Sequence, residues 1–164
     1  IDLKAKGLVR KIGFSIYTPD ELDVLYGSFK PDIVQAPFNL LDRRLEESGW
    51  LEKLYDANIE IHIRSIFLQG LLLMSNTDRP KKFDKWQAIW VKLENWTKEN
   101  NISKIEAALS FAFSDNRVSR IVIGVDSLNQ LKDIVAKCQT TSDFPNSIGI
   151  EDTRLLDPSE WDSI

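Results

Sequence analysis

Residues 121–133, with the sequence IVIGVDSLNQLKD, combine a strand-like apolar run with residue types that can hold a phosphate group. An apolar run ahead of Gly124 is typical of a strand that is buried on both faces, as in a parallel sheet. Ser127 and Gln130 have the spacing of a capping box, which predicts that a helix begins at Ser127. The free N–H groups and the dipole at the start of that helix attract anions, and Gly124 lets a phosphate approach the backbone. An ordinary strand–turn–helix joint without a ligand explains the same residues equally well.

Three other groups of residues carry reactive or charged side chains, and each has a structural interpretation that we favour. His62 is the only histidine and lies inside an apolar alternation, so we expect a structural or surface residue instead of a catalytic one. Residues 42–44 (DRR) are expected to form a solvated turn with a local ion pair instead of an anion site. Cys138 has no nearby histidine, so we expect an unreactive thiol.

The composition of the chain argues against several classes of function. The 164 residues carry a net charge of −4, and 43% of them are hydrophobic, which is enough for one domain with a proper core. Mild acidity argues against a nucleic-acid partner, because such proteins usually present a basic face. No apolar run reaches the roughly 18 residues that a membrane span needs. With a single cysteine the chain has no internal disulfide and no metal cluster, so we expect a cytoplasmic protein without a metal.

Strand-like and helix-like segments alternate four times along the chain, and this order predicts an α/β fold with a parallel sheet. The strands are expected at residues 8–15, 33–38, 59–67 and 120–124. Four such units correspond to half of an eight-stranded TIM-type (β/α)8 barrel, although a small doubly wound open sheet has the same pattern. We expect residues 1–139 to form this body and residues 140–164 to form a tail packed on it. In either fold, ligands bind at the carboxyl ends of the strands.

Local signals predict where several helices begin or end. Gly7 can take the left-handed conformation that closes a helix formed by the residues before it. Residues 18–21 (TPDE) have the cap, proline and glutamate that begin a helix. Residues 103–106 (SKIE) form a second capping box. Because the chain opens on the end of a helix, we expect it to begin in the middle of a protein.

Several ordered motifs resemble the second half of the aldo-keto reductase superfamily. The motifs are KIGFS (11–15), PDIVQAPFNLLDRR (31–44), SIFLQGLL (65–72), IGVDSLNQL (123–131) and a bacterial-type ending, LLDPSEW (155–161). The resemblance implies the carboxy-terminal half of a TIM-type barrel. Members of the superfamily reduce small aldehydes or ketones with NADPH or NADH, or oxidise the corresponding alcohols, and they need no metal.

The resemblance places the nicotinamide ring near the ends of the first three strands. Ser15 matches a serine that holds the nicotinamide amide, but its usual neighbour, an asparagine, is Ile16 here. Gln35 matches the glutamine that holds the same amide, and its side chain offers both a donor and an acceptor. The aromatic residue that stacks on the nicotinamide ring falls at Arg64, whose flat guanidinium can also stack on a ring.

The same resemblance implies a phosphate-binding region after the third and fourth strands. Ser65 and the segment Leu68–Gly70 match the loop that borders the pyrophosphate, while Phe67 and Leu68 could instead line a substrate pocket. Gly124 matches part of the segment that holds the adenosine phosphate.

The residues expected near the adenosine leave the choice between NADP and NAD open. Many relatives carry a lysine and an arginine where this chain has Ser127 and Gln130. Asp126 adds a carboxylate beside them, which is unfavourable for a 2′-phosphate. Asp133 matches a carboxylate that reaches the adenine, although the asparagine that usually follows it is Ile134. NADH or dual use is therefore expected alongside NADPH.

The family's catalytic Asp, Tyr, Lys and His have no counterpart in this chain, so the resemblance implies no catalytic residue here. One hypothesis is that the chain is the cofactor-binding half of a reductase whose missing amino-terminal half performs the chemistry. A second is a non-catalytic half-barrel that dimerises or assembles to cover an apolar inner face and open sheet edges. A third is an unrelated open α/β sheet with a phosphate ligand.

Overall fold

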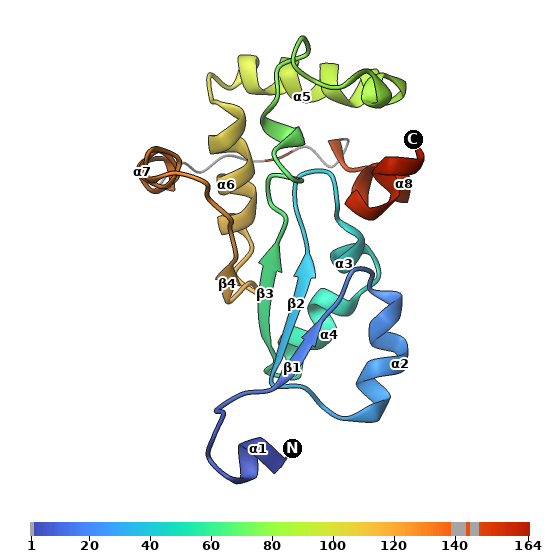
Figure 1. Ribbon diagram of the computed structural model, residues 1–164, viewed down its shortest axis with the longest axis vertical. Helices are drawn as coiled ribbons and strands as arrows, with labels where there is room; N and C mark the ends of the chain where they lie inside the picture. The colour runs from blue at the N-terminus through green and yellow to red at the C-terminus, as the bar shows by residue number, and fades with distance from the viewer. Residues whose placement is uncertain (1, 139–143, 145–147) are drawn as a thin grey trace.

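The computed structural model describes residues 2–138, 144 and 148–164, and it contains one parallel sheet (Figure 1). The strands are β1 (Gly13–Ser15), β2 (Ile33–Pro37), β3 (Glu60–Arg64) and β4 (Arg120–Ile121). Each strand pairs in parallel with the one before it, in the spatial order β1-β2-β3-β4. This sequential order is that of a barrel, because a doubly wound sheet reverses its strand order at a switch point. The predicted α/β half-barrel is therefore confirmed.

Helices and 3₁₀ segments precede, connect and follow the strands. They are α1 (Asp2–Ala5), α2 (Asp20–Ser28), α3 (Arg44–Glu47), α4 (Trp50–Asp56), η1 (Leu71–Leu73), η2 (Lys81–Trp86), α5 (Gln87–Glu99), α6 (Lys104–Ser114), α7 (Leu128–Lys137), α8 (Thr153–Leu156) and η4 (Pro158–Ser163). Figure 1 shows α5 across the end toward which the arrows of β2 and β3 point, and α1 at the opposite end. None of the helices in the described ranges is both long and apolar enough to cross a membrane.

The predicted helix ends at Gly7, Ser103 and Ser127 are confirmed. Gly7 has φ +67° and closes α1. The Ser103 hydroxyl accepts from the N–H of Glu106 at 3.3 Å, and the Glu106 carboxylate accepts from the N–H of Ser103 at 2.7 Å. At the start of α7 the Ser127 hydroxyl accepts from the N–H of Gln130 at 3.2 Å. These short-range hydrogen bonds satisfy N–H groups that a helix leaves without a partner.

The first strand is much shorter than residues 8–15. The Asp32 carboxylate accepts the N–H of Ile12 at 3.0 Å, so a side chain takes the hydrogen bond that a longer strand would form with a backbone carbonyl. Leu8 is 69% exposed, so nothing in the core holds the residues before β1 against the sheet. The strand begins only at Gly13.

The two faces of the sheet differ sharply in polarity. Val34, Ala36, Ile61 and Ile63 point to the helix-covered face and are at most 1% exposed. Burying such an aliphatic side chain stabilises a fold by about 1.5–3 kcal/mol, so this face holds the sheet to its helices. The opposite face carries polar side chains, namely Ser15, Gln35, Glu60, His62, Arg64 and Arg120. The expectation of an apolar inner face is therefore wrong, because strict alternation along β2 and β3 leaves the polar residues on that side.

The end of the chain packs on the body. The N–H of Ile150 donates to the Leu41 carbonyl at 2.9 Å, and Leu155 is fully buried. The Trp161 ring meets the Phe83 ring edge-on, with centroids 4.9 Å apart. The expected boundary between residues 139 and 140 lies outside the described residues.

Candidate functional site

A cleft of about 530 Å³ lies at the carboxyl ends of β3 and β4. Residues 64–73 after β3 and residues 122–134 around the start of α7 form most of it, and Ile105 of α6 completes the lining. Of the predicted site residues, it is lined by Arg64, Ser65, Gly70, Gly124, Asp126, Gln130 and Asp133. Phe67 lines it as well. The structure thus brings together residues that lie about sixty positions apart in the sequence, at the end of the sheet where α/β proteins bind ligands.

The segment after β3 follows an unusual backbone path. Ser65, Leu68, Gln69 and Gly70 have φ angles of +59°, +46°, +54° and +82°. Left-handed conformations at three non-glycine residues are costly and persist only where surrounding contacts hold them. The Leu68 side chain supplies one such contact, because it is only 1% exposed and so points into the core instead of the cleft. Leu68 can therefore act on a ligand only through its backbone.

Asn39, at the end of β2, fixes this segment to the sheet. Its side-chain amide donates to the Ser65 carbonyl at 3.0 Å. Its side-chain oxygen accepts the N–H groups of Leu41 at 2.9 Å and Asp42 at 3.0 Å. The residue is 1% exposed, and its bonds to Leu41 and Asp42 are buried while the bond to Ser65 is partly buried. Sequence reasoning gave Asn39 no role, and its position at a strand's carboxyl end was the only available signal.

The α7 side of the cleft combines open backbone with polar side chains. An added Cβ at Gly124 or at Gly70 would meet no atom within 4 Å, so both glycines face open space. The Gln130 side-chain oxygen accepts the N–H of Asp126 at 2.7 Å, which orients its amide at the cleft. These features fit a phosphate-bearing ligand that approaches the backbone closely. Ser127 does not line the cleft, since its hydroxyl caps α7.

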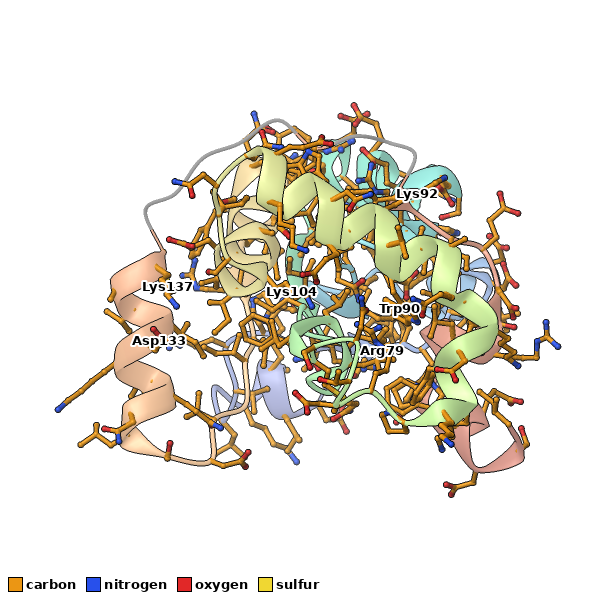
Figure 2. The ribbon with its side chains drawn as sticks, turned by 90° about the horizontal axis from the view of Figure 1, so that it is seen from above. Arg79, Trp90, Lys92, Lys104, Asp133 and Lys137 are labelled. Carbon is orange, nitrogen blue, oxygen red and sulfur yellow. The ribbon has the colours of Figure 1, made fainter. Side chains whose placement is uncertain are left out.

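Asp133 lies one turn further along α7 and also lines the cleft. It forms an ion pair with Lys137 at 3.0 Å, and Figure 2 shows both residues on α7 at one side of the molecule. The same view shows Arg79 beside Trp90, and the Arg79 guanidinium carbon is 4.2 Å from the ring centroid. Arg79 therefore supports α5 instead of the cleft.

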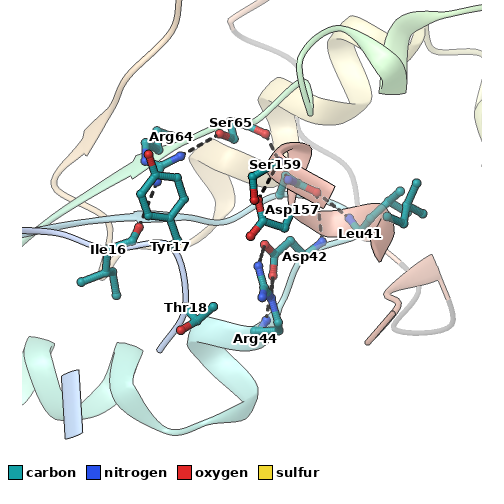
Figure 3. Close-up of polar contacts among 12 residues, drawn as sticks. Ile16, Tyr17, Thr18, Leu41, Asp42, Arg44, Arg64, Ser65, Asp157 and Ser159 are labelled. Carbon is teal, nitrogen blue, oxygen red and sulfur yellow. Dashed lines mark hydrogen bonds and ion pairs between the residues drawn. The ribbon is translucent and has the colours of Figure 1, made fainter. Parts of the chain in front are cut away.

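Ser15 and Gln35 lie together beside the cleft instead of lining it. They are paired in the register of β1 and β2, and the Ser15 hydroxyl donates to the Gln35 side-chain oxygen at 3.2 Å. Arg64 links them to the cleft, because its guanidinium donates to the Ile16 carbonyl at 3.0 Å while the residue also lines the cleft (Figure 3). Apart from Leu68 and Ser127, the residues predicted to contact the nucleotide thus either line the cleft or are linked to it through Arg64.

The turn at residues 42–44 is not solvated, which corrects the sequence-based expectation. Asp42 is 1% exposed, and its two carboxylate oxygens accept from the Arg44 guanidinium at 2.8 and 2.7 Å (Figure 3). The predicted local ion pair is present, but both of its side chains are largely shielded from solvent. A buried pair of this kind is retained because breaking it would leave an uncompensated charge.

His62 belongs to a polar chain on the inner face of the sheet. Its Nε2 lies 2.8 Å from a carboxylate oxygen of Glu60, which also pairs with Lys11. Hydrogen bonds from His62 and Lys11 lower the pKa of Glu60 to about 2. His62 thus has a structural partner, in agreement with its expected role. Within the described residues, no group of three or more His, Cys, Asp or Glu side chains is arranged to hold a metal ion.

Comparisons with known proteins agree on one family. The model of the aldo/keto reductase family matches residues 1–148. The holo form of aldo-keto reductase AKR11C1 from Bacillus halodurans is similar, with a TM-score of 0.67 and 21% identity over 85% of this chain and 48% of that chain. Its apo form has a TM-score of 0.69 and 19% identity over 90% and 51%. Glycerol dehydrogenase AKR11B4 from Gluconobacter oxydans has a TM-score of 0.55 and 20% identity over 88% and 54%.

At these identities the solved structures support the fold alone. The chain spans about half the length of the structures that it matches. No curated protein sequence matches it.

Proposed function

This chain belongs to the aldo/keto reductase family, and on that premise we propose that it is the half of an NAD(P)-dependent reductase that binds the nicotinamide dinucleotide. The observation that supports the proposal is the cleft, which lies between the strained segment after β3 and the start of α7. Gly70 and Gly124 face open space, and the amino terminus of α7 lies beside the cleft. Both features suit the pyrophosphate and adenosine of a dinucleotide. The parent enzyme would reduce a small carbonyl compound or oxidise an alcohol.

The residues define how the dinucleotide would be held. Gln35, oriented by Ser15, offers an amide that can pair with the nicotinamide amide. Gly70 and Gly124 offer backbone to the phosphates, and Asp133 is available to the adenine. When bound, the nucleotide supplies a hydride, and the residues of this chain orient the ring that carries it.

We assign the proton-transfer residues to a complementary half-barrel. This chain has no counterpart of the family's catalytic Asp, Tyr, Lys and His. Leu128, Leu131 and Val135 are 64%, 40% and 63% exposed on α7, and such an apolar stripe suits another helix packed beside it. The rival proposal of a non-catalytic assembly module loses one of its two supports, because the inner face of the sheet is polar, while β1 and β4 remain open edges.

Replacing Gln35 with alanine tests the proposed function. NADH is titrated into the full chain while tryptophan fluorescence is followed, and Gln35→Ala is expected to weaken binding about tenfold because two hydrogen bonds are lost. Gln87, exposed on α5, provides the matched control, and Gln87→Ala should bind as the wild type does. Equal affinities for all three proteins would reject the nicotinamide assignment, and absence of NADH binding to the wild type would reject the function.

Asp126 is expected to set the choice between the two nucleotides. Asp126→Lys should raise the affinity for NADPH relative to NADH by about tenfold or more, because it replaces a repulsive charge by an attractive one near the 2′ position. The same charge change at the exposed Asp56, in α4 far from the cleft, should leave the ratio unchanged. The two dissociation constants are compared at one ionic strength. Equal gains for both nucleotides would show that Asp126 is remote from the 2′ position.

A further inference from the structure

Among the residues that the structure describes, Arg64 carries a positive charge that only neutral groups contact. Its guanidinium donates to the Ile16 carbonyl at 3.0 Å and to the Ser65 hydroxyl at 3.3 Å. The ring of Tyr17 lies beside it, with the guanidinium carbon 4.8 Å from the ring centroid (Figure 3). No carboxylate within the described part of the chain forms an ion pair with it, whereas Arg44 pairs with Asp42. The charge of Arg64 is held in place without being neutralised.

The position of this charge is well defined. Arg64 and Gln35 point from the same face of neighbouring strands, since Gln35 pairs with His62 and Pro37 pairs with Arg64. The guanidinium reaches across the end of β2 to the residue that follows Ser15. The guanidinium therefore lies between the Ser15–Gln35 pair and the cleft. A flat ligand group that contacted both would have to pass beside it. Tyr17 and the Ile16 carbonyl restrain it from turning into solvent.

We propose that Arg64, held by Tyr17, makes this site select the reduced over the oxidised nicotinamide nucleotide. The inference rests on the proposed function and deepens it. The nicotinamide ring carries a full positive charge when oxidised and none when reduced. A guanidinium can stack on either ring, but a like charge at stacking distance is repulsive in a partly buried site. An aromatic side chain at the same place would attract the cationic ring instead.

The selection has a consequence for the direction of the reaction. Because binding and redox state are linked, a site that prefers the reduced nucleotide makes the bound nucleotide easier to reduce and releases the oxidised form readily. In a complete enzyme this favours loading with the reduced cofactor and rapid exchange after hydride transfer. The same preference makes bound NADH a weaker hydride donor, so Arg64 would favour cofactor exchange and not the hydride-transfer step itself.

The test measures dissociation constants of NADH and NAD⁺ for the full chain and for three variants. Arg64→Gln removes the charge and keeps a donor for the Ile16 carbonyl, and it should lower the preference for NADH by roughly tenfold, mainly through tighter binding of NAD⁺. Arg64→Lys keeps the charge and should keep the preference. Arg120→Gln removes a positive charge from the same face of the sheet, outside the cleft. It should change the preference less than twofold, because a charge at greater distance interacts more weakly with the nicotinamide ring.

Three outcomes would overturn the inference. An NADH preference that is unchanged in Arg64→Gln shows that the charge does not face the nicotinamide ring, although NADH binding itself would leave the proposed function intact. An equal effect of Arg120→Gln shows that total charge, not the position of Arg64, is responsible. Failure of the wild type to bind either nucleotide rejects the proposed function together with the inference.

Discussion

Replacing Gly13 with alanine is expected to lower the free energy of unfolding by about 2–3 kcal/mol, the upper range for a side chain that overfills a close contact. Gly13 pairs with Ile33 at the start of β1, and an added Cβ would overlap the Ile33 carbonyl oxygen. That oxygen is backbone, so the clash cannot be relieved by turning a side chain. The strands must move apart, and the register that places Ser15 beside Gln35 should be lost with them.

The control for this prediction is another glycine with room around it. Gly27 lies in α2, and a Cβ there would meet no atom within 4 Å. Gly27→Ala should therefore raise the free energy of unfolding by about 0.5–1 kcal/mol through helix propensity. Urea denaturation followed by circular dichroism measures both variants. If Gly13→Ala proved as stable as the wild type, the close approach of β1 to β2 would be refuted.

The elements of this fold could be predicted because their signals are short-ranged. The caps at Ser103 and Ser127 depend on residues three positions away, and Gly7 depends only on its own backbone. The apolar segment 33–38 after the break at Pro31 also identified the strand that carries Gln35. Local patterns of this kind can be detected within a window of about a dozen residues.

The buried polar contacts could not be predicted, because their partners are distant in the sequence or are defined only by the fold. Asn39 and Ser65 are 26 residues apart and meet only once β2 and β3 are paired. Asp42 and Arg44 were expected to be solvated, since nothing local shows that later segments cover them. The left-handed conformations of Ser65 and Leu68 follow from the same tertiary contacts, because neither residue type favours them.

The same distinction between local signals and contacts made by the fold applies to the site residues. Ser15 ends β1, Gln35 pairs with it inside β2, and Gly124 follows β4 by three residues, so a correct strand order was enough to bring them to one side of the sheet. Ser127 was expected to contact a ligand, and in the structure its hydroxyl oxygen caps α7. A side chain that both caps a helix and matches a binding motif has two possible roles, and only the structure shows which atoms are already engaged.

Replacing Asn39 with alanine is expected to cost about 3–5 kcal/mol, since each buried polar group left without a partner costs about 1–3 kcal/mol. The change would leave the N–H groups of Leu41 and Asp42 without their hydrogen bonds, and the Ser65 carbonyl would keep only the N–H of Leu68 at 2.9 Å. Ser65 would also lose the contact that holds its left-handed backbone, so NADH should bind more weakly to whatever protein remains folded. Asn95→Ala, at an exposed position of α5, should stay within about 0.5 kcal/mol of the wild type.

Hydrogen exchange separates a local effect of Asn39→Ala from general destabilisation. If Asn39 is a positioning residue, the amides of Leu41 and Asp42 should lose more protection than the amides inside β3, whose ladder hydrogen bonds remain intact. A uniform loss across the sheet would mean that Asn39 stabilises the whole fold without a special hold on the segment after β3. Unchanged exchange at both amides would show that the two hydrogen bonds they donate contribute nothing. The strained segment beside the cleft would then need another explanation, because no other side chain described here bonds to the Ser65 carbonyl.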